Sequence, residues 1–276
     1  MKIIVTNDDG FGSPGIHALA AMVSRLGHEP VVVAPAQDMS GASAAIGRIE
    51  LDRPTPVRRV QLPPPADDVE AYAVDGPPGM AALLAVRGGI DGLEPDYLFS
   101  GINIGTNTGH SILHSGTVGA ALTAATFGLS GLAVSLAVSK PMAWEYAYAY
   151  VEEAMTLLEQ APRATVLNVN VPVPRPGSEP QKLRWAELDR FGSFRVAVAE
   201  RREAEVQLEY RSTGTGHELD PDSDTALVDS GTATITALEA IRAVPPEELP
   251  FGRPPPEPEP RLAPGPGSVR AAGSAD

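Results

Sequence analysis

An Asn-Asp-Asp-Gly stretch at residues 7–10 holds the residue types best suited to chemistry in this chain. Two adjacent carboxylates, Asp8 and Asp9, serve one site only if the backbone turns there, and Gly10 and Gly12 permit that turn. Because such carboxylates repel each other, the pKa of one rises unless a cation neutralises them. A hard divalent metal ion resolves this conflict and supports attack of an activated water on a phosphoryl or acyl centre. By composition alone, Asp-Asp-Gly is also typical of a solvated turn.

Further oxygen-bearing side chains follow two other apolar runs of the chain. Serine hydroxyl and asparagine carbonyl oxygens, with water, can complete the oxygen shell of a divalent metal. The candidates from all three segments are Asn7, Asp8, Asp9, Asp38, Ser40, Ser43, Ser100, Asn103 and Asn107.

A turn rich in small residues at 114–119, His-Ser-Gly-Thr-Val-Gly, leads into an uncharged stretch with helical character. Free backbone N–H groups and the positive end of a helix dipole can hold a phosphate there without lysine. The same spacing also fits a plain Ser or Thr helix cap, and both interpretations stay open. His110 and His114 are four residues apart, but Gly109 and the Ser-Gly pair disfavour the helix that a zinc pair would need.

The elements that position these residues follow from the apolar patterning. Buried strands are predicted at 2–6, 30–34, 96–100, 132–136 and 165–171, and helices at 14–25, 117–127 and 144–160. Strand, helix and strand within the first 35 residues form a βαβ unit, so we expect a mostly parallel sheet flanked by helices. In such a sheet ligands bind beyond the carboxyl ends of the strands, where the oxygen-bearing residues above are expected.

Composition excludes several classes of function. The 276 residues include no Cys, which removes disulfides, thiol nucleophiles and cysteine-based metal sites. A net charge of −14 disfavours tracking of nucleic-acid backbones. No lysine stands in the GxxxxGK[ST] pattern of a P-loop, so no P-loop is expected. Residues 10–15 nearly match GxGxxG, but two carboxylates precede the first glycine and Pro14 removes an N–H, so no NAD site is expected either. The N-terminus does not resemble a signal peptide and the uncharged stretch at 115–139 is broken by glycine, so we expect a cytoplasmic protein without membrane contact.

The texture of the chain changes after Pro172. Segments 181–187, 194–200 and 204–211 alternate polar and apolar residues, which indicates antiparallel strands or hairpin arms. Ten of the 28 prolines lie between Pro245 and Pro266, a composition typical of extended or disordered chain. We therefore expect a catalytic core at 1–175, a β-rich arm and closing segment at 176–244 that serves oligomerisation, and a proline-rich tail at 245–276.

Four separated blocks together resemble the survival protein E (SurE) family of metal-dependent nucleotidases. They are Val5–Gly10, Val33–Pro35 followed by Ser40-Gly41, Ser100–Asn107, and Ser115–Ala121. The match is strong over about residues 1–140, and weaker at Asn168–Pro172 and from Asp224 through Leu238. The resemblance implies a Rossmann-like fold with a C-terminal arm that builds dimers or tetramers, and hydrolysis of nucleoside monophosphates to nucleoside and phosphate.

The resemblance also implies roles for individual residues. It assigns one divalent cation per subunit, Mg²⁺ or Mn²⁺, to Asp8, Asp9, Ser40 and Asn103, with Asp8, Asp9 and Asn103 acting in catalysis. It places around the substrate phosphate Asn7, Ser40, Asn107, Ser115, Gly116 and Thr117.

Two departures from the family pattern bear on the substrate. Where the family usually has Gly-Thr-Pro-x-Asp-Cys, this chain has Gly-Pro-Pro-Gly-Met at 76–80, and an acidic position after Val-Gly-Ala-Ala is Thr123. The alternatives are therefore the same phosphatase chemistry on a phosphorylated metabolite other than a nucleotide, or a nucleotide-binding module with weak catalysis.

Overall fold

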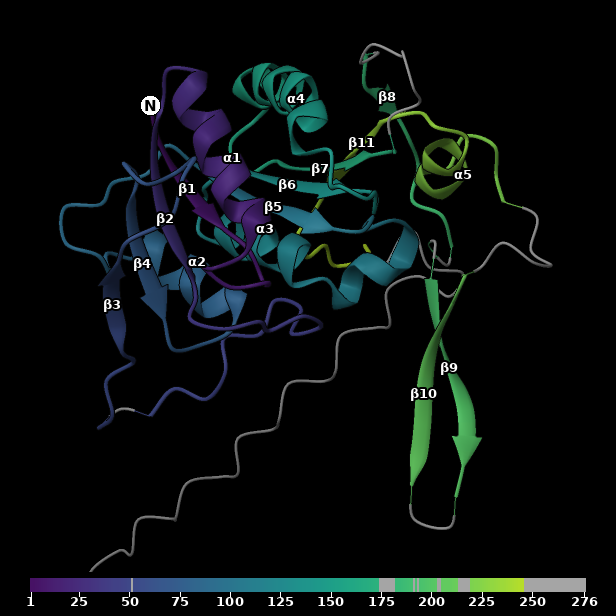
Figure 1. Cartoon of the computed structure of the whole chain (residues 1–276), viewed down its shortest axis with the longest axis horizontal. Helices are drawn as coiled ribbons and strands as arrows, with labels where there is room; N and C mark the ends of the chain where they lie inside the picture. Colours follow the sequence, from purple (N-terminus) through teal and green to yellow (C-terminus); the bar gives the residue numbers. More distant parts are fainter. Residues whose placement is uncertain are drawn as a thin grey trace, which may run out of the picture. The chain divides into compact units, whose positions relative to one another are not determined.

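Apolar runs without polar alternation form the central strands of one large sheet in the computed structural model (Figure 1). The structure describes residues 1–50, 52–173, 182–190, 192, 194–202, 205–212 and 219–245, and the proline-rich segment 246–276 lies outside them. Six strands run parallel: β1 (Lys2–Thr6), β2 (Glu29–Pro35), β4 (Glu70–Val74), β5 (Tyr97–Ile104), β6 (Gly131–Leu136) and β7 (Val166–Val171).

Three further strands complete the sheet at its edges. β3 (Val57–Val60) pairs antiparallel with β4, β11 (Thr234–Leu238) pairs antiparallel with β7, and β8 (Arg184–Trp185) extends β11. The order across the sheet is β3-β4-β2-β1-β5-β6-β7-β11-β8. A separate antiparallel pair is formed by β9 (Phe194–Arg201) and β10 (Val206–Ser212), in the region where alternation predicted hairpin strands.

Helices cover both faces of the sheet. Alternate strand residues such as Ile3 and Val5 pack in one apolar cluster with α1 (Pro14–Arg25) and α4 (Tyr148–Gln160). Ile4 points to the other face, in a second cluster with α2 (Pro78–Val86) and α3 (Gly116–Thr126). These two clusters make a three-layer α/β/α arrangement, which confirms the predicted fold class.

Short helical segments complete the described structure. They are the 3₁₀ turns η1 (Gly109–His114) and η2 (Trp144–Ala147) and the helix α5 (Asp224–Asp229). The helix predicted at 144–160 therefore begins as a 3₁₀ turn. Within the described ranges, no helix is both long and apolar enough to cross a membrane.

Strand order places a topological switch point beside the Asn-Asp-Asp-Gly stretch. β1 lies between β2 and β5, and the chain builds outward through β2 and β4 before it crosses back to β5, β6 and β7. The carboxyl ends of β1 and β5 therefore lie at the position where open α/β sheets bind ligands.

Candidate functional site

Asp8 is a buried carboxylate at the end of β1, with 4% of its surface exposed. The Thr117 hydroxyl donates a hydrogen bond of 2.6 Å to Asp8 Oδ1. Gly116 packs directly on the same carboxyl group, since a Cβ there would lie 2.7 Å from Asp8 Oδ2. Burial raises the pKa of Asp8, and the hydrogen bonds from Thr117 and the Gly116 backbone oppose that rise. The first turn of α3 therefore fixes one carboxylate of the predicted metal site.

Asp9 is half-buried beside Asp8 and lacks a donor for one of its oxygens. Its Oδ2 atom is buried and accepts no hydrogen bond from any residue that the structure describes. Burial, followed by the negative charges of Asp8 and Asp38, raises the pKa of Asp9 to about 6. A buried acceptor without a donor, next to a second buried carboxylate, is electrostatically suited to a cation.

Asn7 shapes the turn that brings the two carboxylates to one site. Its side-chain amide nitrogen donates a hydrogen bond of 3.0 Å to the Gly10 carbonyl oxygen, and Gly10 has a positive φ of 90°. Its Oδ1 atom is buried and, among the described residues, accepts no hydrogen bond. The site thus contains a second buried acceptor without a donor, which could be satisfied by a cation or by a hydrogen-bond donor of a bound ligand.

The loop after β2 brings Ser40 next to Asp8. The Met39 backbone N–H donates 2.8 Å to the Asp8 carbonyl, so the residue adjoining Ser40 is bonded to the Asp8 backbone. The Ser40 backbone N–H and hydroxyl donate 2.8 Å and 2.7 Å to Asp38 Oδ1, which lowers the pKa of Asp38. Ser40 is exposed, and its hydroxyl is bonded to Asp38 in this structure.

Close backbone approaches hold the rest of this loop, residues 38–47. A Cβ on Gly79 at the start of α2 would lie 2.7 Å from the Ala44 carbonyl oxygen, and one on Gly119 in α3 would overlap the Ser43 backbone. The Ser43 hydroxyl donates 2.5 Å to the Leu113 carbonyl. Glycine on both helices therefore allows the loop to pack against them.

Asn103 comes from the irregular end of β5. The pairing register with β6 shifts between Ser100 and Asn103, a type of irregularity that re-aims side chains near active sites. The Asn103 amide nitrogen donates 2.7 Å to the Gly105 carbonyl, which leaves its carbonyl oxygen as the side chain's acceptor. Asn103 thus fits the role of a neutral oxygen ligand.

The Ser-Gly-Thr turn begins α3. The Ser115 hydroxyl accepts a bond of 3.1 Å from the Val118 N–H and so caps the helix. Gly116 and Thr117 lie in the first turn and contact Asp8, as described above. The structure thus shows the cap, while the Gly116 backbone bonds to Asp8, and phosphate binding at this turn stays a prediction.

The structure brings part of the predicted set into direct contact. Asp8, Gly116 and Thr117 touch, and Ser40 adjoins a backbone bond to Asp8. Among the described residues, Asn103 and Asn107 form no hydrogen bond to Asp8, Asp9 or Ser40. Their strands place them on the same carboxyl edge of the sheet.

Two buried asparagines on β7 bind the predicted site residue Asn107 but were not themselves predicted as site residues. Asn168 and Asn170 are fully buried and bind the backbone of Asn107, whose side chain donates 3.0 Å to the Ser135 hydroxyl. Asparagine at every second position of an otherwise apolar strand was the sequence signal that could have identified them.

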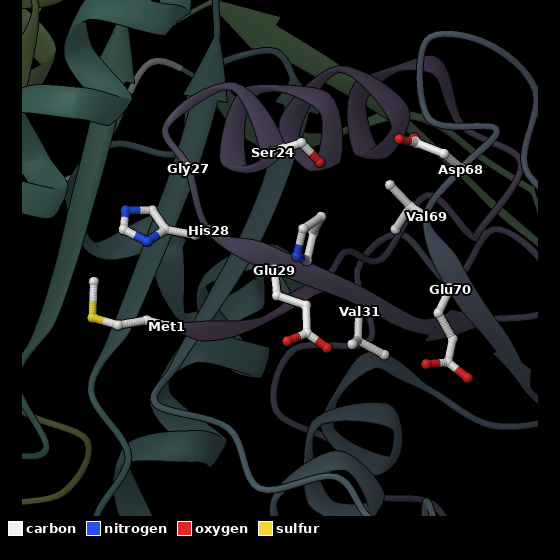
Figure 2. A pocket seen from close by; sticks show the side chains of 10 residues that line it. Met1, Ser24, Gly27, His28, Glu29, Val31, Asp68, Val69 and Glu70 are labelled. Atoms are coloured by element: carbon white, nitrogen blue, oxygen red, sulfur yellow. The ribbon is translucent and has the colours of Figure 1, made fainter.

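No cluster of three or more His, Asp or Glu side chains arranged to hold a metal occurs among the residues with described placement. A cavity of about 600 Å³ lies at the amino ends of β1 and β2, where His28, Glu29, Asp68 and Glu70 line it (Figure 2). It is at the opposite end of these strands from Asp8 and contains none of the predicted site residues.

Comparison with known proteins connects these features to one family. The family model for survival protein SurE matches residues 3–193. The 5'-nucleotidase SurE of Xanthomonas campestris pv. campestris (strain B100) is 38% identical over 207 residues, which are 74% of this chain and 72% of that protein. The protein of the same name from Xanthomonas oryzae pv. oryzae (strain PXO99A) gives the same identity and coverage. The crystal structure of the SurE protein from Aquifex aeolicus aligns with a TM-score of 0.71 at 26% identity, covering 88% of this chain and 95% of that one.

Proposed function

This chain belongs to the SurE family, and on that premise we propose that it is a phosphatase that hydrolyses nucleoside monophosphates to nucleoside and phosphate. The observation that carries the proposal is the pair of carboxylates at the switch point, where Asp8 is buried and Asp9 keeps a buried oxygen without a donor. The relatives named 5'-nucleotidase SurE support the substrate class.

Metal dependence is a general property of the family. We propose that one Mg²⁺ or Mn²⁺ per subunit binds to Asp8, Asp9, Ser40 and Asn103. All four present oxygen, and the two carboxylates supply the charge that such hard cations require. When bound, the ion supplies Lewis-acid polarisation of a phosphoryl oxygen and lowers the pKa of water.

The chain's own residues perform the remaining steps. Ser115, Gly116 and Thr117, at the start of α3, would lie around the phosphate oxygens, because the helix dipole favours negative charge there. The Asp8 or Asp9 carboxylate would accept the proton of the attacking water as the new P–O bond forms. The ester P–O bond breaks, and the leaving nucleoside oxygen takes up a proton.

Thr117 and Asn103 act through orientation and charge. The Thr117 hydroxyl holds the Asp8 carboxylate and stabilises its ionised form. Asn103, Asn7 and Asn107 line the same edge of the sheet and would stabilise charge that develops on the phosphoryl oxygens.

A different phosphorylated metabolite is the second candidate substrate. The Gly-Pro-Pro-Gly-Met departure lies under the Ser40 loop, because Gly79 packs against Ala44 and Ala45. A changed wall at this point would alter what fits beside the phosphate. A module that binds nucleotides with weak catalysis is the non-enzymatic alternative.

We also propose that the β9–β10 pair serves self-association as a dimer or tetramer. In the described part of the chain these two strands pair only with each other, and Val206 is 51% exposed. Light scattering of the full chain tests the assembly. The cytoplasmic location expected from the sequence remains a prediction.

Replacement of Asp8 tests the phosphatase proposal. With Mg²⁺ or Mn²⁺ and a chromogenic phosphate ester, Asp8→Asn should remove nearly all turnover, because it removes one of the two anionic ligands. A variant with the parental rate would refute the assignment. A panel of nucleotides, sugar phosphates and polyphosphate separates the nucleotide substrate from other metabolites, and equilibrium binding of nucleoside monophosphates without phosphate release would identify the binding module.

A further inference from the structure

The segment between Asn107 and Ser115 joins two parts of the site and has little regular structure of its own. It contains the single 3₁₀ turn η1, and parts of it are exposed, with Leu113 at 70%. Its ends carry Asn107 and the Ser115 turn, both predicted to face the phosphate. Something outside the segment must therefore set its position.

Two asparagines of β7 hold the first end. The Asn107 backbone N–H donates 2.7 Å to Asn170 Oδ1, and the Asn107 carbonyl accepts bonds of 2.9 Å from both Asn168 and Asn170. Both asparagine side chains are fully buried, so these bonds are shielded from water. Asn107 thus has its backbone N–H and carbonyl tied to the end of β7.

Asp224, at the start of α5, holds the next residues. Its side chain is fully buried, and its Oδ2 atom accepts a bond of 2.8 Å from the Gly109 N–H. Its Oδ1 atom accepts from the N–H groups of Asp189, at 3.0 Å, and Thr225, at 2.8 Å. One carboxylate therefore ties two distant backbone stretches, at Gly109 and Asp189, to the start of α5, using two acceptor oxygens that a neutral amide does not have.

Gly109 lies in close contact with the backbones of Asp189 and Gly192. Gly109 has a positive φ of 58°, and a Cβ there would lie 2.7 Å from the Asp189 carbonyl oxygen. The His110 N–H donates 2.9 Å to that same carbonyl. The segment therefore packs against Asp189 and Gly192, while Asp224 at the start of α5 accepts a hydrogen bond from the Gly109 N–H.

We infer that Asp224 is a positioning residue for the reaction, which fixes Gly109 so that Asn107 and the Ser115 turn face the substrate phosphate. The inference rests on the proposed function. Asp224 acts through the backbone of the segment and is separate from the predicted metal ligands. Misplacement of phosphate-binding groups by about 1 Å can reduce rates by about 100-fold, so such an anchor affects catalysis as well as stability.

The test compares Asp224→Asn with two controls in the same helix, all in the full-length protein. Ser223→Ala removes the cap that the Ser223 hydroxyl provides to the Ala226 N–H at 3.3 Å, but leaves the Gly109 bond. Asp229→Asn makes the same chemical change at the exposed end of α5. Measured quantities are kcat, KM for a nucleoside monophosphate, affinity for Mn²⁺, and binding of inorganic phosphate by calorimetry.

Asp224→Asn should raise KM and weaken phosphate binding by at least about 10-fold, while affinity for Mn²⁺ stays within about twofold. Ser223→Ala should lower thermal stability without a change in KM, and Asp229→Asn should match the parent. If Asp224→Asn lowers stability but leaves KM, kcat and phosphate binding unchanged, Asp224 is only structural and the inference is wrong.

If Asp224→Asn does not fold, Asp224→Glu is measured instead. It keeps both acceptor oxygens but reaches one methylene further toward Gly109, so phosphate binding should weaken severalfold, and parental binding would overturn the inference. Phosphate binding is measured without a nucleotide. A parent that binds phosphate but does not cleave nucleoside monophosphates would therefore contradict the proposed function and leave the Asp224 comparison intact.

Discussion

Substitution of Gly116 by alanine should displace the Asp8 carboxylate without removing any of the predicted metal ligands. A Cβ at this position would lie 2.5 Å from Asp8 Cβ, 2.7 Å from Oδ2 and 2.9 Å from Cγ, whereas ordinary contacts begin at 3.4 Å. The shortest of these contacts is about 0.9 Å too close, so the side chain of Asp8 or the first turn of α3 must move by about that distance. Because a shift of about 1 Å at a catalytic group can cost about 100-fold in rate, we expect kcat/KM to fall by about 10- to 100-fold. That loss corresponds to about 1.4–2.7 kcal/mol of transition-state stabilisation.

Phosphate release from a nucleoside monophosphate at saturating Mg²⁺ or Mn²⁺ is the assay. Urea denaturation should show a loss of about 1–3 kcal/mol in the free energy of unfolding, which is typical of overpacking and leaves the protein folded. The matched control is Gly12→Ala, since a Cβ on Gly12 would meet no atom within 4 Å. If Gly116→Ala keeps kcat/KM within twofold of the parent, the close packing of α3 on Asp8 does not govern catalysis and the reasoning fails.

Three further predictions concern the hydrogen bond to Asp8, the pKa of Asp9 and the core. Thr117→Val removes the donor to Asp8 and should lower kcat/KM by about 10- to 100-fold in the same assay, and Thr117→Ser should restore most of it. When a chelator removes divalent metal ions, the folded chain should keep the Asp9 proton up to about pH 6, whereas an unfolded aspartate releases it near pH 3.8. The free energy of unfolding should therefore fall as pH rises through this window. Urea denaturation at a series of pH values measures it, and a free energy of unfolding that increases with pH would contradict the raised pKa of Asp9. Leu19→Ala, at a fully buried position, should cost about 2–5 kcal/mol by urea denaturation and leave kcat of the folded protein unchanged.

The strongly patterned elements could be predicted from the sequence. The helix expected at 14–25 is observed at Pro14–Arg25, because the Ser13 side chain accepts a hydrogen bond from the Gly15 N–H and Pro14 has no N–H that would need an acceptor in the first turn. The buried strands after residue 95 were located within a few residues, since parallel strands covered on both faces are continuous apolar runs.

Other elements lacked a usable signal. Helix α2 was not predicted, because its residues are nearly all apolar and give no helical periodicity. Strand β3 is an edge strand with two central arginines, so it shows no apolar run. In both cases the sheet and its neighbours determine the conformation more than the local sequence does.

The candidate site was predictable where polar residues directly follow strands. Asp8 and Asp9 stand at such a point, and the structure places both at the switch point. The supporting contacts were not predictable, because the hydrogen bonds from the Asn107 N–H to Asn170 and from the Gly109 N–H to Asp224 join residues 63 and 115 positions apart. Such pairs depend on the order of strands in the sheet, which spacing along the chain does not reveal.

Anomalous diffraction from crystals of the full chain soaked in Mn²⁺ tests the central claim most directly. The account predicts one strong peak per subunit at the carboxyl edge of β1 and β5, with oxygens of Asp8, Asp9, Ser40 and Asn103 at about 2.0–2.3 Å from it. The Asp8→Asn variant should lose this peak. A parental crystal with no peak at these residues, or with its strongest peak elsewhere, would contradict the account.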